Sequence, residues 1–183
     1  MEPKIDILPI VSQLEDYVII KKSNLFPTYN LFDDLDIVCK DSEQNVLTVE
    51  KVAKPYKDKG FSIIKTYAKN HLHLDFHFGT NPINFRFDFI DSINHAPLVE
   101  VESSFLSKVL QTKMEVSLDQ YSYFVPSEEY EMVFRLLEYF DYPGKYRHLK
   151  YVRARVSSYP EFFNIIEEYT NLDVSRTKNL LLV

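Results

Sequence analysis

The sequence has few of the features that mark disulfide-bonded, membrane-spanning or nucleic-acid-binding proteins. Its single cysteine, Cys39, excludes an intrachain disulfide, and we expect it to be a small buried apolar residue. It shows neither a charged-then-apolar leader nor a run of about 18 apolar residues, so we expect a cytoplasmic protein with no membrane partner. The formal net charge of -6 disfavours nucleic acid as a partner, because displacing its counterions requires a net basic face.

The chain instead has ample apolar and aromatic material for a core. Its 183 residues are 45% hydrophobic and 15% aromatic, enough for one well-filled core or for a core with a small helical annex. Helix-like and strand-like patterns alternate, so we predict an α/β (α+β) fold with a mixed β-sheet and flanking helices. In this part of the chain we expect helices at 3–16 and 46–56, and strands at 17–20, 34–39, 61–67, 71–78 and 83–90.

The second half is predicted to be mainly helical. Ser127, two glutamates and a helical apolar periodicity mark one helix start clearly. The residues near Pro97 form the expected hinge between an α/β core at 1–97 and a helical part at 98–183 that walls a cleft. Helices are expected at 103–112, 127–140, 145–156 and 160–169, with a short ribbon of strands at 114–125.

Two strand-like segments, 71–78 and 83–90, alternate polar and apolar residues. Closing them as a hairpin puts the aromatic residues on one face, which packs inward. A slip by one residue would set polar side chains against aromatic ones, so the pattern itself favours one register. The opposed pairs in this register are Phe78 with Ile83, Asp75 with Arg86, and His73 with Asp88. The polar face then carries His73, Asp75, His77, Asn84, Arg86 and Asp88.

Carboxylates gather at the start of the strand expected at 34–39. Asp34 and Asp36 have the i, i+2 spacing that puts both on one face of a strand, about 6.5–7 Å apart at the backbone. Asp88, on the polar face of a later strand, can complete the set. Such a set suits a hard cation such as Mg²⁺ and the phosphoryl-type transfers that use it.

At these residues the sequence resembles the nucleotidyltransferase superfamily that includes DNA polymerase beta and the aminoglycoside nucleotidyltransferases. The family pattern is an apolar strand ending in Gly-Ser or Gly-Gly, a loop, Asp-hydrophobic-Asp on the next strand, and a third acid on a later strand. Here 17–20 supplies the strand, Lys22-Ser23 stands in place of Gly-Ser, and Asp34-Leu35-Asp36 and Asp88 follow. The resemblance covers about residues 17–91. Glu138-Tyr139-Phe140 with Lys145 and His148 is similar to the helical half of small bacterial members, and we find a further similarity to members found with surface-polysaccharide genes.

The resemblance implies a Mg²⁺ (or Mn²⁺) dependent enzyme. It would transfer a nucleoside monophosphate from an NTP to a hydroxyl or phosphate of a small, sugar-like acceptor. The implied catalytic and metal-binding residues are Asp34, Asp36 and Asp88, and the implied nucleotide-binding residues are Lys22, Ser23, Lys145 and His148. The family glycine lets the backbone approach the triphosphate, so Lys22 either replaces that approach with its charge or marks an inactive binding module.

Several of these residues have a plainer structural interpretation. Asp33 has the opposite parity to Asp34 and Asp36, which favours a turn or cap. Asp75 is an alternative third ligand, although an ion pair with Arg86 is the simpler role. By default Ser23 caps a turn, and the segment with Lys145, Arg147 and His148 is a solvated helix face.

A zinc-dependent hydrolase is a further alternative. The string His71-x-His73-x-Asp75-x-His77 superficially resembles the metal motif of metallo-β-lactamase-like hydrolases. The extra residue before His77 breaks that motif, and residues strung along about 20 Å of strand cannot all reach one ion. The chain has only 3 glycines, and no Gly-rich environment supports such a site.

Overall fold

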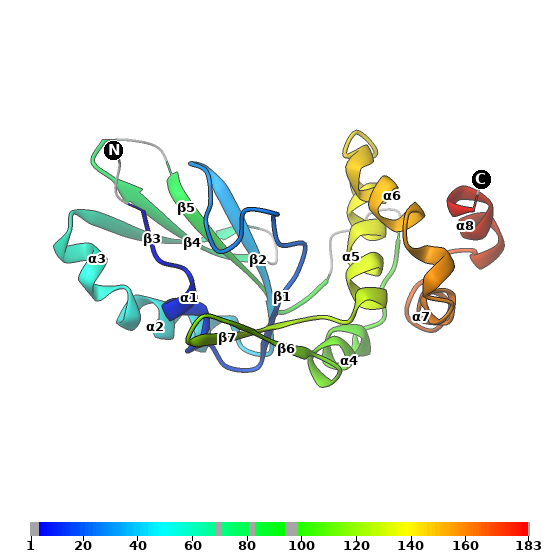
Figure 1. Cartoon of the computed structure of the whole chain (residues 1–183), viewed down its shortest axis with the longest axis horizontal. Coiled ribbons are helices and arrows are strands. Elements are labelled where there is room, and N and C mark those ends of the chain that lie inside the picture. The colour runs from blue at the N-terminus through cyan, green and yellow to red at the C-terminus, as the bar shows by residue number, and fades with distance from the viewer. Residues whose placement is uncertain (1–3, 69–70, 81–82, 94–98, 183) are drawn as a thin grey trace.

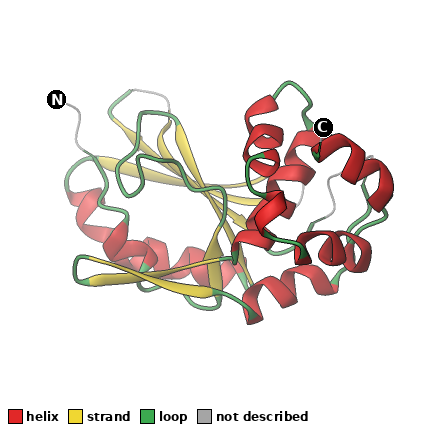
Figure 2. Cartoon of the chain, turned by 45° about the vertical axis from the view of Figure 1, so that its right-hand side comes forward, coloured by secondary structure: helices red, strands yellow, loops and turns green. Residues whose placement is uncertain are grey.

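The computed structural model describes residues 4–68, 71–80, 83–93 and 99–182, and it confirms the mixed α/β class. Within these residues five strands form one sheet, two more form a separate hairpin, and helices lie on both sides (Figures 1 and 2). The hinge expected near Pro97 lies outside the described residues. No helix within the described ranges is long and apolar enough to cross a membrane.

The sheet has the strand order β1-β2-β5-β4-β3. Its neighbours β2 and β5 are parallel, and the other adjacent strands run antiparallel. β-branched and aromatic residues at alternate positions favour extended backbone in these segments. The strands are β1 (Tyr17–Ile19), β2 (Asp33–Cys39), β3 (Phe61–Ala68), β4 (His71–Phe78) and β5 (Ile83–Ile90), close to the predicted ranges.

The hairpin of β4 and β5 has the predicted register over most of its length. His73 is opposite Asp88, and Asp75 is opposite Arg86. The aromatic residues of both strands then share one buried face, and this burial is what fixes the register.

Near the turn the predicted register is wrong. A bulge sets Ile83 opposite His77 rather than opposite Phe78. The extra residue is Asn84, which is buried and does not belong to the exposed polar face. Its side-chain oxygen accepts a hydrogen bond of 2.8 Å from the buried hydroxyl of Tyr29, a partner from a distant loop.

Strand alternation gives the sheet two different faces. One face is mainly apolar and packs against α1 (Leu8–Val11), α2 (Ser42–Val52) and the hairpin of β6 (Met114–Leu118) and β7 (Tyr121–Val125). The other face is apolar only at one end, around Val18 and Val38, where the helices of the second half cover it. Its remaining part is mostly polar, and the section with Asp36, His73 and Asp88 lines a cavity.

The second half is mainly helical, and its four predicted helices match observed ones within a few residues. The helices are α4 (Ser104–Gln111), α5 (Glu128–Asp141), α6 (Tyr146–Arg153), α7 (Glu161–Tyr169) and α8 (Val174–Leu181), with a 3-10 turn at Val156–Ser158. α8 was not predicted. The hairpin of β6 and β7 joins the core of the first half through the buried ring of Tyr123.

Two helix predictions in the first half need correction. The helix expected at 3–16 is confined, within the described residues, to Leu8–Val11. The helix expected at 46–56 begins earlier, at Ser42, because the Asp41 side chain caps it by accepting a 2.9 Å hydrogen bond from the backbone of Gln44. A second short helix, α3 (Lys54–Asp58), follows it.

The Asp75–Arg86 pair tests how far the polar sheet face depends on ion pairing. Arg86 donates to both carboxylate oxygens of Asp75, at 2.6 and 2.8 Å, and the side chains are 7% (Asp75) and 28% (Arg86) exposed. Arg86→Ala would leave a buried carboxylate unpaired, so we expect it to lower the free energy of unfolding by about 3 kcal/mol. Asp75→Ala should cost less, about 1–2 kcal/mol, because the guanidinium can reach water. Urea unfolding measures both.

The double variant is the control for this prediction. If Asp75 and Arg86 interact mainly with each other, the double variant should lose much less free energy of unfolding than the sum of the losses in the two single variants. Strictly additive costs, or a larger cost for Asp75→Ala than for Arg86→Ala, would contradict the interpretation.

Candidate functional site

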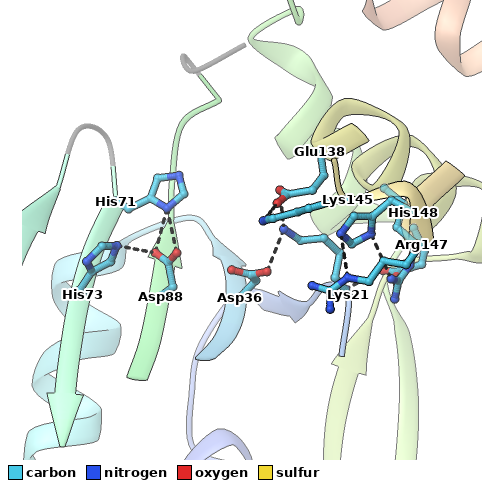
Figure 3. A network of polar contacts seen from close by, with 11 residues as sticks. Lys21, Asp36, His71, His73, Asp88, Glu138, Lys145, Arg147 and His148 are labelled. Carbon is cyan, nitrogen blue, oxygen red and sulfur yellow. Dashed lines mark hydrogen bonds and ion pairs between the residues drawn. The ribbon is translucent and has the colours of Figure 1, made fainter. Parts of the chain in front are cut away.

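A cavity of about 780 Å³ lies between the polar part of the sheet and the helices α5 and α6 (Figure 3). Its volume is in the range of small-molecule sites. All seven residues predicted for the site line it. The residues that line its sheet side include Asp34, Asp36, His71, His73 and Asp88, and those of its helix side include Arg135, Glu138, Lys145, Arg147 and His148.

The three predicted carboxylates meet at the sheet side. Asp36 of β2 is directly opposite Asp88 of the parallel strand β5, and Asp34 is opposite Arg86. Because neighbouring strands are about 4.8 Å apart, the side chains of Asp36 and Asp88 start side by side. Burial raises the pKa of Asp34, and the negative charges of Asp36 and Asp88 raise it further. The three groups are therefore close enough to interact electrostatically.

Lys21, which the sequence patterns did not identify, connects the sheet to α5 at this site. Its ammonium lies 2.8 Å from a carboxylate oxygen of Asp36 and 3.1 Å from one of Glu138. Its backbone N–H donates to Glu131 at 2.9 Å. Burial alone would lower the pKa of Lys21, but the charges of Asp36 and Glu138 outweigh burial and raise it.

The backbone of Lys21 also has a conformation that glycine favours. Its φ is 51°, in the left-handed region that side chains other than glycine rarely adopt. The resemblance placed the family glycine one residue later, at Lys22. The glycine-like backbone is therefore found at Lys21, whose side chain turns to Asp36 and Glu138.

Lys22 and Ser23 line the cavity but have local partners. The ammonium of Lys22 lies 5.8 Å from the centre of the Tyr123 ring. The hydroxyl of Ser23 accepts a hydrogen bond of 3.2 Å from the backbone N–H of Leu25, which is the turn-capping role considered for it. Their assignment to nucleotide binding stays a prediction.

Other structural interpretations are confirmed. Asp33 accepts a 2.7 Å hydrogen bond from the backbone of Asn30, so it stabilises a turn. Asp75 is held by Arg86, as described above. Cys39 is buried, and burial raises the pKa of its thiol to about 12.

The helix wall is a network of charges around Glu138. Glu138 makes two ion pairs, one with Lys145 and one with Lys21. Burial would raise the pKa of Glu138, but the charges and hydrogen bonds of Lys21 and Lys145 outweigh it and lower the pKa to about 2. Lys145 and Arg147 are exposed, as expected for a solvated helix face.

His148 departs from that default interpretation because it is buried, with 3% of the residue exposed. Burial lowers the pKa of His148 to about 4; Glu138 opposes this shift, whereas Arg135 and Arg147 add to it. The imidazole is therefore neutral near pH 7. Its ring nitrogens each lie 3.5 Å from a guanidinium nitrogen, Nδ1 from Arg135 and Nε2 from Arg147, so this neutral imidazole contacts the cations of the helix wall.

A second cluster, which the sequence analysis did not assemble, lies beside Asp88. One ligand atom from each of His71, His73 and Asp88 lies within 4.8 Å of the others. The proposed zinc string does not form such a group, since Asp75 pairs with Arg86 and the described cluster leaves out His77. Burial would lower the pKa of His71, but hydrogen bonding and charge from Asp88 outweigh it and raise the pKa.

No protein-family model, no curated protein and no solved structure matches this chain. The resemblance to nucleotidyltransferases therefore rests on the residues and their arrangement alone.

His148 generates a prediction about pH. Between about pH 6.5 and its folded pKa of about 4, the unfolded chain binds a proton at this residue that the folded chain does not bind. The stability of the folded protein should therefore fall as the pH falls through this window. His148→Gln removes the titrating group, so its free energy of unfolding should fall less than that of the wild type. Urea unfolding at about pH 7.5 and pH 5 compares them; equal losses would show that His148 does not titrate in this way.

Proposed function

We propose that this chain is a Mg²⁺-dependent nucleotidyltransferase that moves a nucleoside monophosphate from an NTP to a hydroxyl or phosphate of a small, sugar-like acceptor. The observation that carries the proposal is the placement of Asp34, Asp36 and Asp88 on paired parallel strands, at a cavity whose opposite wall bears cationic side chains. Transfer from a triphosphate needs carboxylates for a metal ion and cations for the phosphates. The resemblance in motif order supports the same assignment.

The donor set fits the proposed metal. Mg²⁺ prefers oxygen ligands, and the three side chains supply carboxylate oxygens from one face of the sheet. Burial raises the pKa of Asp34 most, the negative charges of Asp36 and Asp88 raise it further, and a bound cation would offset that repulsion. When bound, Mg²⁺ would supply the Lewis acidity that polarises the phosphate and stabilises the pyrophosphate leaving group.

The helix side supplies groups suited to phosphates and to the acceptor. Lys145 and Arg147 are exposed cations at the cavity, and Arg147 offers a fork of donors that matches phosphate oxygens. His148 is neutral and lies 3.5 Å from guanidinium nitrogens of Arg135 and Arg147, so it would help to position these cations for the nucleotide phosphates. The cavity volume of about 780 Å³ is in the range of sites that hold a small molecule such as a nucleotide.

One observation favours a second candidate, a nucleotide-binding module without transfer activity. Lys21 places its ammonium 2.8 Å from Asp36, where it competes with a metal ion for the same carboxylate. A chain in which this ion pair persists would bind phosphates through its cations but would not assemble the full metal site. Pyrophosphate release from NTP in the presence of Mg²⁺ and sugar-like acceptors distinguishes the enzyme from the module.

Carboxylate substitutions test the proposed metal site. Asp36→Asn keeps the size of the side chain but removes a metal-binding charge, so Mg²⁺-dependent NTP binding should weaken by at least about tenfold. Binding is measured as the rise in unfolding temperature with NTP and Mg²⁺. The matched control is Asp33→Asn, which makes the same change at a neighbouring position that alternates to the other face of the strand. The asparagine keeps a side-chain oxygen that can accept the hydrogen bond from the backbone of Asn30. Equal NTP binding in both variants would contradict the assignment.

Lys21 and Lys22 provide a matched pair for testing the competition with metal. Lys21→Met removes the ammonium that pairs with Asp36, and we expect Mn²⁺ affinity to rise by about tenfold, which corresponds to about 1.4 kcal/mol for a charged hydrogen bond. Lys22→Met removes the same charge from the cavity but leaves that ion pair in place, so it should raise affinity less. Isothermal titration calorimetry with Mn²⁺ gives both values; a larger effect of Lys22→Met would reverse the assigned roles.

A further inference from the structure

The polar face of the sheet carries a cluster whose chemistry differs from that of the three carboxylates. His71 and His73 are two residues apart on β4, so both project from the same face. His73 is directly opposite Asp88 on β5. Figure 3 shows both imidazole rings turned toward the Asp88 carboxylate. All three residues line the cavity.

The distances in this cluster match those of a metal coordination sphere. His71 Nδ1 lies 2.9 Å from each carboxylate oxygen of Asp88, and His73 Nε2 lies 3.4 Å from one of them. Ligand atoms around a tetrahedral ion are about 3.3 Å apart, given metal–ligand bonds of about 2.0–2.1 Å. All three ligand atoms lie within 4.8 Å of one another, so rotations of the side chains could bring them around one ion.

The donor atoms select a class of metal. Two imidazole nitrogens and one carboxylate oxygen suit divalent transition metals such as Zn²⁺, Co²⁺ and Fe²⁺, whereas Mg²⁺, Ca²⁺ and Mn²⁺ favour oxygen ligands. Sites with three protein ligands leave coordination positions open to water or substrate. Here those positions would open into the cavity, which the same residues line.

We propose that His71, His73 and Asp88 form a binding site for one divalent transition-metal ion, separate from the oxygen-only Mg²⁺ site although it shares Asp88. A carboxylate has two oxygens and can serve two neighbouring cations. Metal binding requires the neutral tautomer of His71 that carries its proton on Nε2, because Nδ1, which donates to Asp88 in the metal-free protein, must offer its lone pair to the ion; a ring that was charged releases one proton to solvent. This site does not depend on nucleotidyl transfer, because its ligands and its test involve no nucleotide.

The experiment titrates the full-length, metal-stripped chain with Zn²⁺ by calorimetry and with Co²⁺ by visible absorption, in the presence of millimolar Mg²⁺. We expect one ion per chain and no displacement by Mg²⁺. His71→Ala and His73→Ala should each weaken Zn²⁺ binding by at least about tenfold, since even the loss of a supporting residue costs that much. Thermal unfolding without metal verifies that each variant is folded. If His73→Ala does not fold, His73→Gln replaces it, because it keeps the length of the side chain.

The matched control is His77→Ala, which removes a histidine from the same strand but outside the cluster. Its Zn²⁺ affinity should equal that of the wild type. The proposal is overturned if the wild type binds no transition metal, if Mg²⁺ displaces the ion, or if binding persists in both His71→Ala and His73→Ala. Loss of binding in His77→Ala alone would place the metal elsewhere and would overturn it too.

Discussion

The parallel pairing of β2 with β5 is the constraint on which the rest of the site depends. The register that sets Asp36 opposite Asp88 also sets Leu35 opposite Phe87 and Ile37 opposite Phe89, and these apolar residues are buried on the other face. A slip by one residue would carry the carboxylates into the core and the aromatic rings into the cavity. Hydrophobic packing on one face therefore holds the acidic groups together on the other, despite their repulsion.

Lys21 is the second element that the site requires, because it ties the sheet to the helix wall. Its ammonium lies between Asp36 of β2 and Glu138 of α5, and Glu138 also holds Lys145. The two walls of the cavity are thus joined by partly buried charges rather than by apolar contact alone. A ligand that took over Asp36 would replace the contact between Lys21 and Asp36 and leave Lys21 paired with Glu138.

The sequence predicted what depends on local alternation and missed what depends on distant partners. Side chains alternate between the two faces of a strand, and this alternation was enough to predict that Asp34 and Asp36 share a face and that Asp75 lies opposite Arg86. The bulge at Asn84 depends on a hydroxyl from outside the hairpin, and the importance of Lys21 depends on Glu138, 117 residues later. The His71 contact with Asp88 is diagonal, whereas alternation predicts directly opposed pairs. α8 gave no signal, since few of its residues are buried apolar ones.

Under the proposed function, the charges around the cavity would make nucleotide binding depend on metal. Among the described residues that line it, six carboxylates oppose five Lys and Arg side chains. Asp34, Asp36 and Asp88 crowd the sheet side, so the phosphates of a nucleotide would be repelled there until cations bind. The exposed cations Lys145, at the N-cap of α6, and Arg147, in its first turn, line the same cavity from the helix side. A metal ion on the sheet side would therefore convert a region that repels triphosphate into one that attracts it, and metal would have to bind before the nucleotide or together with it.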